Sequence, residues 1–136
     1  MKTKLILATL LFTFCLFANA QLVIKTDVSQ DLYFDTELKD WQVVKDHDVP
    51  TIFKLAEDMK TLSYTEKGVT DDFTIKTWEF NDEKAVFDLI IHDTSYNEFT
   101  VIIDGINLFL SMTTQIEGTD FMLLYNIVDI INESEE

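Results

Sequence analysis

The second half of the chain alternates apolar and polar residues with a period of two. Phe87, Leu89 and Ile91 fall on one face of an extended segment, whereas Asp88 and His92 fall on the other. This period is typical of a β-strand with one buried face, because successive side chains of a strand point to opposite sides. The pattern predicts strands and argues against helices in this half of the chain.

Polar breaks of hairpin length separate several such segments. The segments cover residues 72–80, 85–93, 98–104, 107–114 and 120–130. Asp104-Gly105 predicts a tight turn in which Gly105 takes a positive φ, and Gly118 marks the last turn. A change of parity at Thr77 predicts a bulge or a strand that is buried on both sides. This half therefore predicts an antiparallel meander.

The first half carries a weaker pattern, with short strands expected at 21–25, 31–34 and 41–45 between acidic turns. Residues 50–65 fit two templates. In a helix that starts near Pro50, the apolar residues share one face, whereas in a hairpin the chain turns between Ala56 and Lys60. β-branched and aromatic residues at both ends of the segment favour the hairpin, and the helix stays open.

These segments together predict an all-β fold, an antiparallel meander of about eight strands that forms a small barrel or a sandwich. We expect a single β domain over residues 21–131 and an acidic tail over 132–136 that frays. The inward residues of a small barrel either fill its interior or leave room for one small ligand.

Residues 1–20 have the three parts of a secretory signal peptide. Two lysines precede an apolar run, and Ala18-Asn19-Ala20 forms a cleavage site before Gln21. The only cysteine, Cys15, follows Phe14, which is too bulky for a lipoprotein cleavage site. We therefore expect a secreted or periplasmic protein that keeps no cysteine and has no stable membrane insertion after cleavage.

The chain is strongly acidic, with 25 Asp and Glu against ten lysines and no arginine. Removal of residues 1–20 takes away two lysines and no acid, so the formal net charge falls from −15 to −17. Such a charge repels phosphate backbones and anionic lipid surfaces, which excludes nucleic acid as a partner. The acidity predicts solubility first, and attraction of cations or of a basic partner second.

Catalytic motifs are sparse. His47 and His92 each precede an aspartate, but no serine stands in a G-x-S-x-G turn, and the three glycines are far apart. His47 with Asp46 and Asp48 could hold a metal, although exposed histidines beside solvated acids explain the same residues. We predict no cofactor and no enzymatic activity, with a metal- or His/Asp-assisted hydrolase as the residual possibility.

The aromatic residues carry the remaining signal. If the barrel has a pocket, we expect an apolar ligand to contact five of its residues, Trp78, Phe87, Phe99, Leu110 and Tyr125.

Lys39-Asp40-Trp41 and Thr119-Asp120-Phe121 resemble the G-x-W and T-D-Y motifs of lipocalins over six residues. Lysine replaces the glycine of the first motif, and phenylalanine replaces the tyrosine of the second. The predicted function is a non-catalytic binding or interaction module whose partner is an unknown protein. The alternative is a lipocalin-like barrel that carries a small apolar ligand.

Overall fold

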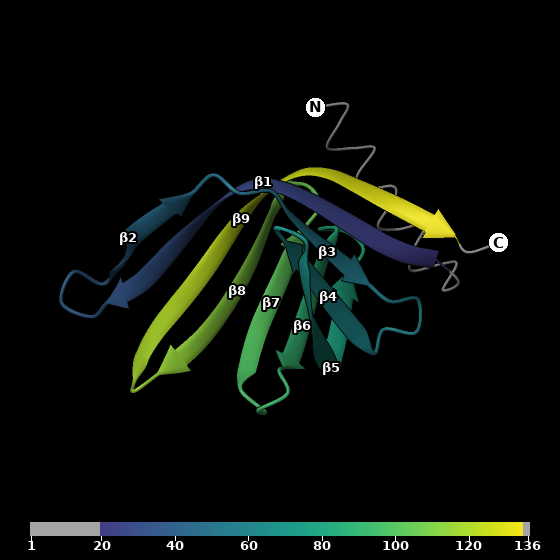
Figure 1. Cartoon of the computed structure of the whole chain (residues 1–136). Helices are drawn as coiled ribbons and strands as arrows, with labels where there is room; N and C mark the ends of the chain where they lie inside the picture. Colours follow the sequence, from purple (N-terminus) through teal and green to yellow (C-terminus); the bar gives the residue numbers. More distant parts are fainter. Residues whose placement is uncertain (1–19, 135–136) are drawn as a thin grey trace.

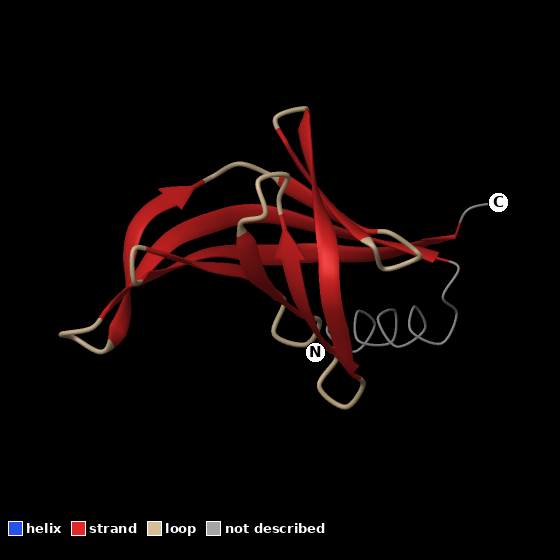
Figure 2. Cartoon of the chain, turned by 90° about the horizontal axis from the view of Figure 1, so that it is seen from below, coloured by secondary structure: helices blue, strands red, loops and turns tan. Residues whose placement is uncertain are grey.

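Residues 20–134 are described by a computed structural model, and strands joined by short loops and turns make up this part of the chain (Figure 2). The nine strands are β1 (Ala20–Asp35), β2 (Asp40–His47), β3 (Thr51–Leu55), β4 (Thr61–Glu66), β5 (Val69–Asn81), β6 (Val86–His92), β7 (Glu98–Asp104), β8 (Phe109–Ile116) and β9 (Thr119–Ser134). The predicted signal peptide and its cleavage site lie almost entirely outside the described residues.

The sheet is antiparallel and its strand order is β2-β1-β3-β4-β5-β6-β7-β8-β9. An additional pairing of β1 with β9 closes eight of the strands into a barrel and leaves β2 outside the ring (Figure 1). Closure removes the free edges that an open sheet would expose. The all-β meander is confirmed, and of the two predicted architectures the barrel is the one that forms.

β1 is one continuous strand, so the two short strands expected at 21–25 and 31–34 with a turn between them are wrong. Its first part pairs with β3 and its second part with β2, while β9 follows it along both parts. The register with β9 shifts between Thr26 and Ser29, where the extra residues form a bulge. A bulge bends a strand without ending it. Asp27 therefore lies within β1, although a polar residue at this position suggests a turn in the sequence.

Residues 50–65 form the β3–β4 hairpin, which confirms the favoured template and excludes the helix. Phe53, Leu55 and Leu62 are fully buried because they share the inward face of the two strands. Met59 adopts a positive φ of 57° in the turn, and its side chain joins the core. The apolar residues of this segment have a helix-like spacing because Met59, a turn residue, packs into the core together with the strand residues.

Of the two alternatives predicted at Thr77, the bulge is confirmed, since the β5–β6 register shifts between Ile75 and Thr77. The shift returns Trp78 and Phe80 to the inward face, opposite core residues of β6. The ring of Phe80 lies 4.6 Å from that of Phe87. Because of this one extra residue, apolar side chains of β5 face the core both before and after the bulge.

A turn follows β7 as predicted, but Gly105 does not supply the positive φ. The left-handed residue is Leu108, with φ 59°. Asp104 Oδ1 accepts hydrogen bonds from the backbone N–H groups of Ile106 at 2.9 Å and Asn107 at 2.8 Å. The aspartate thus stabilises the start of a four-residue turn. The last residue of this turn, Leu108, adopts the unfavourable positive φ.

The same turn design occurs twice more. Asp35 accepts two backbone hydrogen bonds in the turn that ends at Lys39, with φ 54°. Asn81 accepts one, from Lys84, in the turn that ends at Ala85, with φ 52°. By contrast, the turn at Gly118 has two residues with positive φ, which suits a two-residue hairpin. Gly118 therefore marks the last turn, as predicted.

Side chains fill the barrel interior. The largest fully buried ones come from seven strands and are Phe53, Phe87, Leu22, Ile24, Leu55, Leu62, Leu89, Ile91, Ile103, Leu110 and Ile130. β9 continues to Ser134 and pairs with the start of β1, so the strand enters the segment set apart as an acidic tail. Among residues 20–134, no helix is long and apolar enough to cross a membrane.

Candidate functional site

The five residues predicted to contact a ligand all lie on the inward face. Residues directly opposite each other in an antiparallel ladder share a face, and each of the five pairs with a buried residue. Phe87, Leu110 and Tyr125 belong to the core, and Phe99 packs against it. Trp78 stays 49% exposed, although its ring lies 6.4 Å from that of Phe87.

These five residues do not surround one shared hollow. Tyr125 points into the core and borders a groove between β1, β2, β8 and β9, whereas Phe99 lines a separate apolar hollow. Phe87 and Leu110 are fully buried by other side chains. A role of the five residues in ligand binding stays a prediction.

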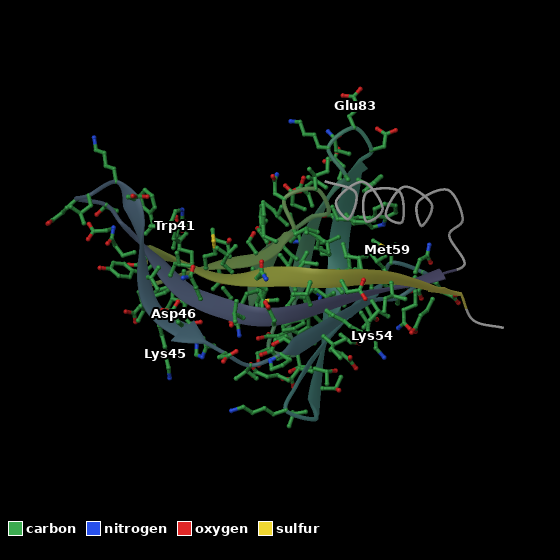
Figure 3. All side chains as sticks on the ribbon, turned by 90° about the horizontal axis from the view of Figure 1, so that it is seen from above. Trp41, Lys45, Asp46, Lys54, Met59 and Glu83 are labelled. Atoms are coloured by element: carbon green, nitrogen blue, oxygen red, sulfur yellow. The ribbon has the colours of Figure 1, made fainter. Side chains whose placement is uncertain are left out.

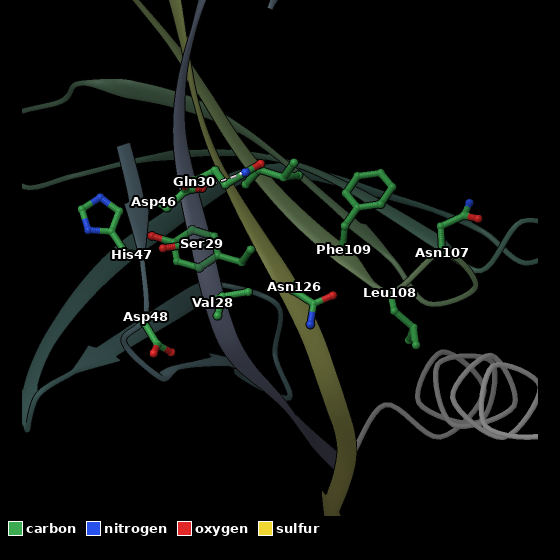
Figure 4. A pocket seen from close by; sticks show the side chains of 12 residues that line it. Val28, Ser29, Gln30, Asp46, His47, Asp48, Asn107, Leu108, Phe109 and Asn126 are labelled. Carbon is green, nitrogen blue, oxygen red and sulfur yellow. Dashed lines mark hydrogen bonds between the residues drawn. The ribbon is translucent and has the colours of Figure 1, made fainter. Parts of the chain in front are cut away.

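The first hollow is a groove of about 470 Å³, named here the outer groove (Figure 4). Its lining comes from β1, β2 with the residue that follows it, the β7–β8 turn with the start of β8, and β9. The lining residues are 28–30, 46–48, 107–109 and 124–126.

The register places this groove on the outer face of the sheet. Phe109 pairs with Asn126, and the next pair along the ladder is Leu110 with Tyr125. Because Leu110 and Tyr125 point into the core, Phe109 and Asn126 point outward. The groove is therefore open to solvent and to a partner, and a ligand can reach it without opening the barrel.

Four polar side chains of the outer groove each contact an aspartate carboxylate. They are Gln30 with Asp46 at 2.9 Å, His47 with Asp31 at 2.8 Å, Asn107 with Asp104 at 2.9 Å and Asn126 with Asp27 at 2.8 Å. The Asn126 amide holds the pKa of Asp27 below its usual range, with help from the backbone N–H of Val28. Of these four aspartates, Asp46 itself lines the groove, and the carboxylate of Asp27 is held in its charged form.

The second hollow, named here the apolar hollow, has a volume of about 360 Å³. Its lining residues are Asp31, Leu32, Val44, Phe99, Met112, Thr114, Ile116 and 121–123. The β7–β8 ladder runs from the pair of Asp104 and Phe109 to the pair of Thr100 and Thr113. Beyond this ladder β8 diverges from β7, as Figure 1 shows, and the hollow lies at the diverging end.

A third, more polar hollow, of about 840 Å³, lies beside the apolar hollow and shares Phe99, Thr114 and Ile116 with it. Its other lining residues come from the start of β7, the end of β8 and the start of β9. Both the apolar hollow and this polar hollow lie where β8 diverges from β7. The open end of the barrel thus offers apolar surface on one side and polar surface on the other.

The two histidines have different surroundings. His47 Nε2 lies 2.8 Å from Asp31 Oδ2, so its partner is on β1 and not the adjacent Asp48. His92 stacks on Tyr96 at 5.2 Å and contacts the backbone oxygen of Asp93. Within residues 20–134, no three His, Cys, Asp or Glu side chains gather as a metal site would require. Hydrolase chemistry at either histidine has no further support from these contacts.

Two tyrosines form the most strongly perturbed titratable pair. Burial, followed by the nearby Glu66 carboxylate, raises the pKa of Tyr64 to about 12. Burial, followed by the neighbouring Tyr64, also raises the pKa of Tyr125. Both rings pack edge-on against Phe53, at 5.4 Å and 4.9 Å. The pair is an element of the core, where protonated phenols are stable.

Comparison with models of protein families, with curated proteins and with solved structures found no match for this chain.

Sequence reasoning missed the outer groove. Its lining comes from four segments that are far apart in the chain, and no segment alone carries a binding motif. Acidic residues at 46 and 48 were visible as a possible cation site, but their apolar neighbours on β8 and β9 were not. Only the pairing of β1 with β9 brings these segments together.

Proposed function

We propose that the chain is a small, exported, acidic binding module without catalytic activity, and that it meets a protein partner through its surface. The observation that carries this proposal is the filled interior of the barrel, in which Phe53, Leu55, Phe87 and Leu110 are all fully buried. A partner must then bind outside, and the outer groove is an open site with both apolar and charged groups.

The alternative is a lipocalin-like barrel that carries a small apolar ligand. The apolar hollow supports it, because Phe99, Met112, Phe121 and Leu123 line a space of about 360 Å³ at the open end of the barrel. Ligand pockets of proteins start at about 300 Å³, so a short acyl chain would fit this hollow. The ligand would lie near the surface and not deep inside the barrel.

A thermal melt with and without dodecanoate separates the two functions. A ligand that binds only the folded state stabilises it by about 2.7 kcal/mol at a hundred times its Kd. The surface module predicts an unchanged Tm. A carrier predicts a higher Tm, and Ile116→Asp, which places a charge at a hollow-lining residue that is 55% exposed, should abolish the rise. A rise that depends on Ile116 would replace the proposed function with the alternative.

Export is tested by the mass of the protein recovered outside the cytoplasm. A chain that starts at Gln21 without an acyl group supports a secreted or periplasmic module. A mass that includes residues 1–20, or a lipid, contradicts this part of the proposal.

Absence of catalysis is tested with a panel of ester, phosphoester and glycoside substrates. The double variant His47→Ala and His92→Ala removes both histidines of the chain. Hydrolysis that the wild type shows and this variant lacks would establish the residual hydrolase and overturn the non-catalytic proposal.

A further inference from the structure

The outer groove combines an apolar floor with a rim of carboxylates, and this combination selects a class of partner. We propose that it binds an extended, lysine- or arginine-bearing segment of a partner protein, an inference that rests on the proposed surface-binding function.

The floor of the groove suits the aliphatic part of a basic side chain. Phe109 and Leu124 lie on the outer face of neighbouring strands, and Val28 lies in the β1 bulge, where it is 42% exposed. Lysine and arginine place three or four methylene groups on apolar surface while the charged end stays in water. An apolar floor open to solvent accommodates such a side chain without burial of its charge.

The rim supplies negative charge and no competing cation. Asp46 and Asp48 stand at the end of β2, and no lysine occurs among the described residues that line the groove. Behind the rim, Asn126 and Asn107 contact the carboxylates of Asp27 and Asp104. A basic segment would gain from the carboxylates of Asp46 and Asp48, whereas an acidic one would be repelled.

His47 also belongs to the lining of the groove. His47 pairs with Ser29, which pairs in turn with the inward-facing Tyr125, so its ring lies on the inward side of the sheet, with Nε2 2.8 Å from Asp31 Oδ2. The aspartates at 46 and 48 therefore remain the charges that a partner meets first.

The size of the groove favours a polypeptide over a metal ion or a small amine. A volume of about 470 Å³ is many times the roughly 30 Å³ of one water molecule in the liquid. The lining also extends across β1, β9 and β8, as Figure 4 shows, so several consecutive side chains of a partner can contact it. Anionic lipids and nucleic acids do not fit, because the net charge of −15 repels them.

The test uses two synthetic heptapeptides, one with alternating leucine and lysine and one in which glutamate replaces every lysine. Each is titrated into the ¹⁵N-labelled protein, and amide chemical shifts are followed by NMR. The lysine peptide should shift amides of residues 28–30, 46–48 and 124–126, and the glutamate peptide should not. Added salt should weaken the interaction, because the rim charges are exposed.

Two double variants test the role of the rim. Asp46→Asn with Asp48→Asn should weaken binding of the lysine peptide by about threefold to tenfold, as expected for exposed ion pairs. Asp82→Asn with Glu83→Gln removes the same charge from the exposed β5–β6 turn and should leave binding unchanged. Figure 3 shows Glu83 on a different part of the molecule from Asp46. The Tm of each variant verifies its fold.

Three results would overturn the groove proposal. They are equal binding of the two peptides, equal weakening by the two double variants, and a lack of shifts at the groove with either peptide. Amide shifts confined to the apolar hollow around Ile116 would contradict binding in the outer groove and place the partner at that hollow, which is compatible with the surface-binding function. That function fails separately, through the dodecanoate melt, so the two failures can be told apart.

Discussion

The same two strands, β1 and β9, pass through two regions of the molecule that differ in packing. In the closed region β1 pairs with β3, and the ladder continues through Leu22, Leu55 and Leu62, which are all fully buried. In the open region β1 pairs with β2, where Val43 and Val44 are 51% and 63% exposed. Figure 3 shows Trp41 and Asp46 in the open region, away from Met59 in the closed one.

The difference shows that residue type does not decide burial here. Both regions contain β-branched and apolar residues, but only the closed region has further strands to complete the ring around the core. β2 has a neighbour on one edge only, since β4 pairs with β3 and does not extend beside β2. Val43 and Val44 of β2 therefore stay at the surface, and both hollows proposed as binding sites have residues of β1 and β2 in their lining.

The largest expected contrast comes from truncation of one apolar side chain in each region. Phe53→Ala should lower the free energy of unfolding by about 3–5 kcal/mol, because it empties a fully buried site between Tyr64 and Tyr125. Val44→Ala should change it by less than about 0.5 kcal/mol, as surface substitutions do. Urea denaturation measures both values, and similar losses would show that the open region is as well packed as the closed one.

A smaller contrast comes from two threonines that make the same hydrogen bond in different surroundings. Thr26 Oγ1 donates to the Thr51 oxygen at 2.9 Å in the buried closed region. Thr114 Oγ1 donates to the Glu98 oxygen at 2.9 Å at the exposed open end. Thr26→Val should cost about 1–2 kcal/mol and Thr114→Val less than about 0.5 kcal/mol, because water replaces only the exposed bond.

The measurement is again the free energy of unfolding, with an unchanged denaturant slope as the control for a similar folded state. Equal costs for the two threonine variants would mean that solvent does not reach the open end.

The smallest effect is confined to alkaline pH. Tyr64 has a pKa raised to about 12 in the folded state, against about 10 when unfolded, so the folded state favours the protonated phenol. This contribution to stability is fully present below pH 10 and is lost as the pH rises through 12. Tyr64→Phe should reduce the loss, as measured by urea denaturation between pH 9 and pH 12.

Tyr96→Phe provides the control for the alkaline experiment, because it removes a phenol that is 80% exposed in the β6–β7 loop. An equal alkaline loss in the wild type and in Tyr64→Phe would contradict the role assigned to Tyr64.

Local patterns in the sequence predicted much of the second half of the fold. Alternation in β6 and β7, the bulge at Thr77 and the turn at Gly118 all depend on residues close in the chain. The turn at Asp104 was placed correctly for the wrong reason, since the side chain of Asp104 and not the freedom of Gly105 stabilises it. Local signals fix where a strand ends better than they fix which residue adopts the unusual φ.

The candidate sites could not be predicted in the same way. Trp78, Phe87, Phe99, Leu110 and Tyr125 face inward as the alternation implies, but which of them border a hollow depends on strands opposite them. The register shift at Asp27 and Val28, which joins two expected strands into β1, also depends on β9.

The sequence by itself determined the period of two, the hairpin turns, the inward faces of most strands and the acidic surface, because these depend on neighbours along the chain. Only the tertiary structure decided that β1 meets β9, that β2 stays outside the ring and that Asp46 lies across a groove from Phe109. These features depend on pairings between residues about a hundred positions apart, such as Ile24 with Ile130. The stability of such pairings comes from the burial of the whole core at once, and no short segment encodes it.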